Sequence, residues 1–133
     1  MAMYVFDTSA DSLIVDNFAI SNFAAGDPVT YAKNNDNIKV DQDAFGDPFA
    51  VVSHKGAGKM NVKLLPGTPS FRKLMELANK NVVFGVTLTM QGERISGTNC
   101  MISRTPNGSI SENSPVRDFT INMLDYKHET IDA

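Results

Sequence analysis

Short runs of alternating apolar and polar residues, separated by turn signals, dominate the sequence. The runs lie at residues 37–41, 59–64, 83–90 and 117–123, with further candidates at 49–54 and 95–104. A period of two places the apolar side chains on one face of a strand, which is typical of antiparallel sheets with one hydrated face. Gly-Asp-Pro and Pro-Asn-Gly turns break the chain between the runs. The pattern predicts a mainly β domain of six or seven strands.

The apolar members of these runs are expected to point into a core. They are Ile38, Val40, Met60, Val62, Leu64, Phe84, Val86, Leu88, Met90, Phe119, Ile121 and Met123. Most phenylalanines fall at such inward positions, so we expect them in the core as well. The polar partners of the alternation would then form a hydrated face.

One segment, residues 70–80, has the period of a helix instead. Its apolar residues follow the i, i+3, i+4, i+7 spacing, at Phe71, Leu74, Met75 and Ala78. Thr68 or Ser70 can cap its start, with Pro69 in the first turn, and residues 79–81 can end it. Because only one stripe is apolar, the helix should lie across a sheet or the mouth of a barrel.

Composition places the chain among ordinary globular domains. It has 133 residues, 42% hydrophobic and 20% charged, which predicts a single domain over residues 1–133. We expect a loose N-terminal arm at about 1–12 and a C-terminal tail at about 128–133. The net charge of −3 argues against specific phosphate binding, and the single Cys100 cannot form an intrachain disulfide. No signal peptide or membrane-spanning run is visible, so the chain is expected to be made in the cytoplasm.

The sequence gives little support for an enzyme. His54 and His128 are expected at the surface, and Cys100 is expected to be a small buried hydrophobe. The aspartates between residues 36 and 47 lack the spacing of a calcium loop. The segment 56–59 lacks the spacing of a phosphate loop. We therefore expect no catalytic residues, no metal, no cofactor and no small-molecule substrate.

The middle of the chain resembles the tail tube protein of bacteriophages with contractile tails. The resemblance is carried by an order of segments: a strand at 37–43, a Phe45-Gly-Asp-Pro48 turn, a returning strand at 49–55, a Gly-Ala-Gly turn at 56–58, a strand at 59–65, Pro66-Gly-Thr-Pro69, and a helix at 70–80. It extends over about residues 12–127. Secretion-system tube proteins share the same core fold.

The resemblance implies an antiparallel β-sandwich or barrel subunit with one helix. Six such subunits would form a ring in which their strands close one continuous barrel, with the helix outside. Stacked rings would form a tube surrounded by the tail sheath protein, with tail terminator and baseplate proteins as further partners. DNA would pass through the lumen into the host when the sheath contracts, without inserting the protein into a membrane. The expected location is the tail of a virion.

Two sets of residues are candidates for roles in such a tube. A lumen that conducts DNA should be polar and not strongly basic, because each phosphate contact adds attraction. The lumen candidates are Asp41, Asp43, Thr87, Thr89, Thr120 and Asn122. Three lysines, Lys39, Lys59 and Lys63, oppose this interpretation if they share the same face. The residues Phe45, Gly46, Asp47 and Pro48 are candidates for contacts between rings or with the sheath.

Other functions remain open from the sequence. The tube of an R-type bacteriocin or of a type VI-like injection system would have nearly the same monomer. A small β-sandwich binding module is a further alternative, although the chain has no tryptophan for an aromatic platform. A small hydrolase would require a role for the two histidines.

Overall fold

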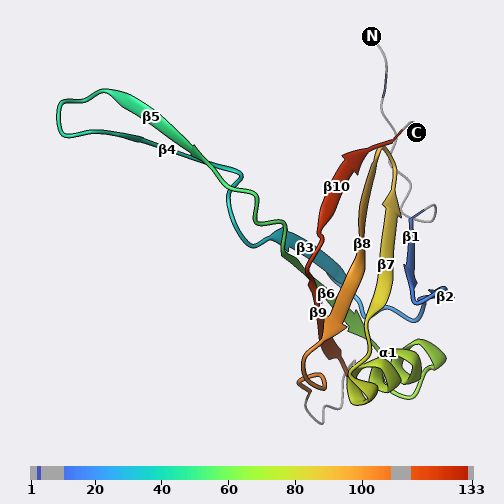
Figure 1. Ribbon diagram of the computed structural model, residues 1–133. Helices are drawn as coiled ribbons and strands as arrows, with labels where there is room; N and C mark the ends of the chain where they lie inside the picture. The colour runs from blue at the N-terminus through green and yellow to red at the C-terminus, as the bar shows by residue number, and fades with distance from the viewer. Residues whose placement is uncertain (1–2, 4–10, 109–114, 132–133) are drawn as a thin grey trace.

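The computed structural model describes residues 3, 11–108 and 115–131 (Figure 1). Within these residues the chain forms strands and a single helix. In chain order they are β1 (Ser12–Val15), β2 (Phe18–Ala19), β3 (Val29–Lys33), β4 (Ile38–Gln42), β5 (Pro48–Val52), β6 (Gly58–Leu64), α1 (Pro69–Lys80), β7 (Phe84–Met90), β8 (Glu93–Ile102), β9 (Arg117–Met123) and β10 (Lys127–Thr130). No helix of the described residues is long and apolar enough to span a membrane. The mainly antiparallel β fold with one helix confirms the predicted class.

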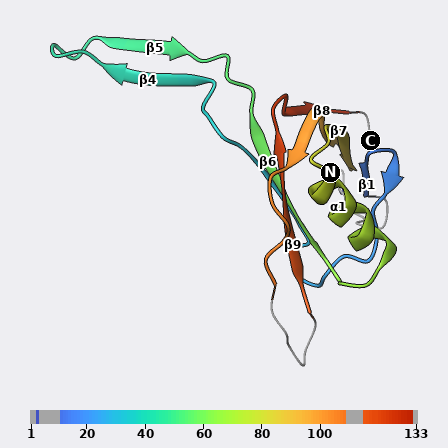
Figure 2. The same cartoon turned by 60° about the horizontal axis from the view of Figure 1, so that its bottom comes forward.

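The strands form one large sheet and one separate hairpin. The large sheet has eight strands in the order β2-β1-β7-β8-β9-β6-β3, with β10 paired to β8. Every pairing in it is antiparallel. The strands β4 and β5 pair only with each other and project far from the rest of the molecule (Figures 1 and 2).

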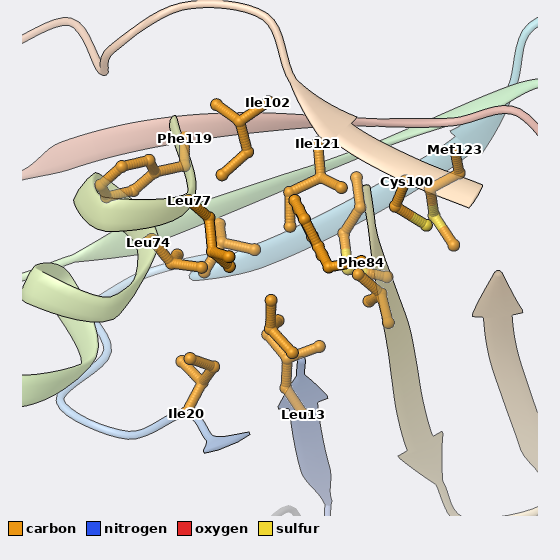
Figure 3. Packing of buried hydrophobic residues seen from close by; sticks show 14 of the residues in the cluster. Leu13, Ile20, Leu74, Leu77, Phe84, Cys100, Ile102, Phe119, Ile121 and Met123 are labelled. Carbon is orange, nitrogen blue, oxygen red and sulfur yellow. The ribbon is translucent and has the colours of Figure 1, made fainter. Parts of the chain in front are cut away.

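The large sheet curves around a hydrophobic core. In Figure 3, Phe119 and Ile121 on β9 lie across the core from Leu13 on β1 and from Ile20. These residues are buried, and Leu74 and Leu77 of α1 pack into the same cluster. Burial of this apolar surface, at about 25 cal/mol per Å², is the main force that holds the layers together. Polar residues that alternate with the core residues therefore point outward from two opposite walls.

The helix begins and ends as its sequence predicts. The Thr68 hydroxyl accepts a hydrogen bond from the backbone N–H of Phe71 at 3.3 Å, which caps the first turn, and Pro69 follows at the first helical position. Asn81 adopts the left-handed conformation, with φ 55°, and ends the helix. The apolar stripe is confirmed and also includes Leu77, which is buried.

The C-terminal residues differ from the expected tail. His128, Glu129 and Thr130 form most of β10, which pairs with residues 93–96 of β8. No side chain of β10 is buried, so no hydrophobic alternation could reveal this strand in the sequence. At the other end, β1 already begins at Ser12. The rest of the expected N-terminal arm, residues 1–2 and 4–10, lies outside the described residues.

Candidate assembly surfaces

The β4–β5 hairpin exposes apolar side chains that the sequence suggested were internal. Ile38 and Val40 were expected in the core, but Val40 is 75% exposed and Ile38 is also largely exposed. Phe49 on β5 is exposed too, contrary to the expectation that the phenylalanines are internal. The alternation was correct as a strand signal, but the hairpin extends past the body, so neither of its faces meets the core (Figure 2).

The register of the hairpin separates its residues into two unlike faces. One face carries no charge and combines Ile38, Val40 and Gln42 with Pro48, Ala50 and Val52, which are paired across the two strands. The other face carries Lys39 and Asp41 together with Phe49 and Val51. An isolated two-stranded hairpin is marginally stable in water, and exposed apolar residues on it indicate a contact surface.

The tip of the hairpin is a well-defined turn that presents one aromatic ring. The Asp43 carboxylate accepts hydrogen bonds from the backbone N–H of Phe45 at 2.8 Å and of Asp47 at 3.0 Å. Gly46 has a φ of 85°, which favours glycine at this position of the turn. Phe45 is 93% exposed as a result. All four residues proposed for contacts, from Phe45 to Pro48, thus lie at the point farthest from the core.

The six lumen candidates lie in three different places. Asp41 and Asp43 are on the hairpin, where Asp43 shapes the turn. Thr120 and Asn122 are on the outward face of β9, and Thr87 and Thr89 are on the outward face of β7. The outward faces of β9 and β7 belong to opposite walls, because their inward residues point toward each other across the core. One bore cannot be lined by both threonine pairs of the same subunit.

The wall formed by β3, β6 and β9 is polar and also carries two lysines. Asn61 pairs with Thr120, whose hydroxyl donates a hydrogen bond to the Asn61 side-chain oxygen at 2.9 Å. Lys59 is in register with Asn122, and Lys63 with Asp118. Lys59 and Lys63 therefore share the face of Thr120 and Asn122. A bore lined by this face would carry positive charge, which opposes the expectation of a lumen without basic residues. Lys39 lies apart from this wall, on the hairpin.

The strand β10 is fastened to the body by polar contacts around Glu93. The Tyr31 hydroxyl donates a hydrogen bond to the Glu93 carboxylate at 2.6 Å, and the His128 Nε2 lies 3.6 Å from the other carboxylate oxygen. The hydrogen bond to Glu93, together with burial and the negative charge, raises the pKa of Tyr31 to about 12. The rings of Tyr31 and His128 also meet edge to face. This cluster connects β3, β8 and β10 at one end of the sheet.

The residues weighed for catalysis are not assembled into a site. His54 is exposed near the base of the hairpin, whereas His128 is on β10. Cys100 is fully buried on β8, and burial, followed by the charge of Asp125, raises the pKa of its thiol to about 11. Among the described residues, no group of three or more His, Cys, Asp or Glu side chains is arranged to hold a metal ion.

Comparison with known proteins shows that chains of contractile injection systems share this fold. The sequence matches no protein-family profile and no curated protein sequence. Solved structures match it over nearly the whole chain, although at low sequence identity. A chain of the sheath–tube complex of an extracellular contractile injection system, PVC, in the extended state has a TM-score of 0.64 and 11% identity, with 96% of this chain and 93% of that chain covered.

Two further structures extend the comparison. A chain of the PVC sheath/tube terminator in the extended state has a TM-score of 0.67 and 11% identity, covering 97% of this chain and 99% of that chain. Hcp1 from Flavobacterium johnsoniae has a TM-score of 0.55 and 13% identity, covering 92% of this chain and 98% of that chain. At these identities the similarity establishes the shared fold, in agreement with the resemblance seen in the sequence.

Proposed function

We propose that this protein is a structural subunit of the tube of a contractile tail or injection apparatus, and that it is not an enzyme. The observation that supports this most directly is the shared fold with a chain of a sheath–tube complex, which covers 96% of this chain and 93% of the other. The match therefore includes the large sheet, the helix and most of the rest of both chains. The proposed work is mechanical and depends on the shape of an assembly.

Six subunits form each ring, and the wall of β3, β6 and β9 faces the bore. This wall presents hydrated side chains such as Asn61, Thr120 and Asn122, which suit a water-filled channel. The opposite wall exposes Ile14 on β1, which suits a protein contact. Closing the strands of neighbouring subunits into one barrel also protects the free edge of β3, which would otherwise be open to aggregation. Within this proposal, Thr87 and Thr89 lie away from the bore.

The finer proposal is a bacteriophage tail tube that conducts DNA from the virion into the host. Its partners are the tail sheath, the tail terminator and the baseplate, and DNA passes without sequence-specific contacts. The alternative is the tube of an R-type bacteriocin or of a type VI-like injection system. Lys59 and Lys63 on the proposed bore wall favour the alternative, because rings of lysine attract phosphates and slow the passage of DNA.

Electron microscopy tests the tube directly. The full chain, purified alone at high concentration and also coexpressed with its sheath and tube-initiating proteins, is expected to give hollow striated cylinders of stacked six-fold rings. Sedimentation velocity should show rings or polymers in the same samples. A protein that remains a monomer in both preparations would contradict the proposal.

Cargo is tested on the assembled tube. If the tube conducts DNA, exchanging Lys59 and Lys63 for glutamine should leave assembly unchanged and should not reduce DNA delivery by the particle. Loss of assembly in these variants would contradict the placement of the β6 lysines in the bore. Particles that contain tubes but no DNA would favour the injection-system alternative.

A further inference from the structure

The loop after β8 contains the only Asn-Gly pair of the sequence, at Asn107 and Gly108. Both residues are exposed, and Asn107 forms an isolated bridge with Asp118 near the start of β9. The hydrogen bond of this bridge, from the Asp118 N–H to the Asn107 carbonyl, is 3.5 Å long, which is beyond the usual range for N–H···O bonds. The pair is therefore accessible to water and only weakly held by the sheet.

An asparagine side chain can react with the backbone of the residue that follows it. The Gly108 nitrogen attacks Cγ of Asn107, a cyclic succinimide forms, and the bond from Cγ to the side-chain nitrogen breaks. Ammonia leaves with the proton that the Gly108 nitrogen gives up. Water then opens the ring at either carbonyl and leaves aspartate or isoaspartate. Glycine permits the attack best, because it has no Cβ to hinder the required turn of the backbone.

The Arg117 side chain places a positive charge at the reacting nitrogen. A Cβ built on Gly108 would lie 2.5 Å from Cδ and 2.6 Å from Nε of Arg117, so the side chain packs directly on the glycine backbone. Arg117 also donates a hydrogen bond to the Val116 carbonyl at 3.0 Å, which helps to hold it at the start of β9. A nearby cation favours the deprotonated Gly108 nitrogen and the oxyanion that develops on the Asn107 side chain.

Asp118 supplies a proton acceptor on the same face. Residues paired directly across antiparallel strands place their side chains side by side, so the Asp118 carboxylate lies beside the Asn107 carboxamide. Its Oδ1 atom is buried and has no hydrogen-bond partner among the residues that the structure describes. A buried oxygen without a partner calls for an explanation. Uptake of the Gly108 proton, as the glycine nitrogen turns toward Asn107, gives this atom a role.

Conversion of Asn107 would change the charge of the wall formed by β3, β6 and β9. Lys63 pairs with Asp118, and Asp118 pairs with Asn107, so the three residues form one row on the outward face. At the outward positions of β6 and β9, Lys59 and Lys63 are positive and Asp118 is negative, which gives a net charge of +1. A carboxylate in place of the Asn107 amide would bring this net charge to zero.

We propose that Asn107 and Gly108 form a self-modification site, at which Asn107 converts to aspartate or isoaspartate with the help of Arg117 and Asp118. The chemistry is independent of the proposed function, whereas its consequence rests on that function. In a tube with this wall toward the bore, conversion removes the excess positive charge and so weakens the attraction of the bore for phosphates.

Peptide mass spectrometry of the full-length protein, stored in the folded state at neutral pH, tests the chemistry. The mass increase of amide-to-acid conversion should appear at Asn107, with isoaspartate resolved from aspartate by chromatography. Asn34 and Asn35 are internal controls, because they are exposed and are followed by residues with side chains. Asn107 should convert at least about tenfold faster than either control. Conversion of Asn107 no faster than that of Asn34 would overturn the proposal.

Substitutions separate a site built by the fold from the reactivity of any Asn-Gly pair. Arg117→Met and Asp118→Asn should each slow conversion about tenfold in the native protein, and neither should change the rate in urea, because only the fold brings these side chains to Gly108. Arg117→Lys keeps the charge and should restore much of the rate. Circular dichroism confirms that each variant is folded. Native rates equal to that of the unmodified chain in both Arg117→Met and Asp118→Asn would overturn the assigned roles.

The modification and the tube can fail separately. Asn107→Asp fixes the product charge and Asn107→Gln blocks cyclisation, so tubes of the first variant should bind a fluorescent single-stranded oligonucleotide more weakly than tubes of the second. Equal binding would reject the effect on the bore. Conversion of Asn107 in a protein that never forms tubes would retain the modification site and reject the proposed function. Tubes in which Asn107 stays unconverted would retain the proposed function and reject the site.

Discussion

Asp125 holds the irregular part of β8 in place. Its carboxylate accepts hydrogen bonds from the backbone N–H groups of Thr98 and Asn99 and from the Thr98 hydroxyl, at 2.6 to 3.1 Å. The register between β7 and β8 shifts at this position, so these N–H groups lack the regular ladder. Asp125→Asn should lower the free energy of unfolding at neutral pH by about 1–3 kcal/mol, measured by urea denaturation. Asp27→Asn, in an exposed turn, is the control and should have little effect.

The same carboxylate makes the stability depend on pH. Partial burial raises the pKa of Asp125, but the hydrogen bonds from Thr98 and Asn99 outweigh it and leave the pKa below its ordinary value. A depressed pKa means that the stabilisation is present above the unfolded-state pKa of about 3.9 and is lost as the pH falls toward the folded-state value. The difference between wild type and Asp125→Asn should therefore shrink below about pH 4. A difference that stays constant from pH 7 to pH 3 would contradict this account.

Cys100 is expected to be chemically inert while the protein is folded. Burial and the nearby Asp125 charge raise the pKa of its thiol to about 11, so little thiolate exists at pH 8. Iodoacetamide should modify the native protein at least roughly a hundredfold more slowly than the urea-unfolded protein, as followed by mass spectrometry. Similar rates in the two states would show that this part of the core opens readily.

At the scale of elements, local patterns predicted the helix and the most regular strands. The apolar stripe of α1 has the helical period, and the apolar residues of β9 have the period of a strand. Each period can be recognised within its own short segment, and both elements form where they were expected. β1, β3 and β10 were not predicted, because each is short and only partly buried or fully exposed. Ile38 and Val40 show a different limit: alternation identifies a strand but does not say whether its apolar face meets the same chain or another surface.

The cap of α1 can be tested by a matched pair of substitutions. Thr68 accepts from the Phe71 N–H and donates to the Leu65 carbonyl at 2.9 Å, and the first turn has no acidic residue to share this role. Thr68→Ala should cost about 1 kcal/mol of unfolding free energy, whereas Thr68→Ser keeps the hydroxyl and should cost much less. Denaturation curves that coincide for the two variants would contradict the role of the hydroxyl.

At the scale of the whole molecule, the candidate assembly surfaces could be predicted only in part. The sequence located the turn at Phe45 and the polar residues of β9, because turn chemistry and alternation are local. It could not separate the two opposite walls, since the assignment of Thr87 and Thr120 to different walls depends on how the sheet curves around the core (Figure 3). The lumen itself stays a prediction until the assembly is imaged.

The hairpin should be dispensable for the monomer and essential for the assembly. Beneath it, β3 and β6 continue to pair as far as the hydrogen bond from the Asn34 N–H to the Ala57 carbonyl at 3.0 Å. Deleting residues 36–55 joins Asn35 directly to Gly56, and Asn-Gly is the preferred two-residue turn between antiparallel strands. The shortened monomer should thus keep its unfolding free energy within about 1 kcal/mol, because the hairpin buries no side chain in the core.

The shortened chain should nevertheless fail to form tubes under conditions in which the full chain does. It lacks the apolar hairpin face and the tip that are expected to contact other subunits, whereas its own core is intact. Circular dichroism and urea denaturation test whether the shortened monomer keeps its fold and its unfolding free energy. Electron microscopy and sedimentation velocity test whether it forms tubes. A shortened chain that still builds regular tubes would show that the projecting hairpin is not an assembly element. A chain that unfolds would instead show that the hairpin supports the monomer, despite its separation from the core.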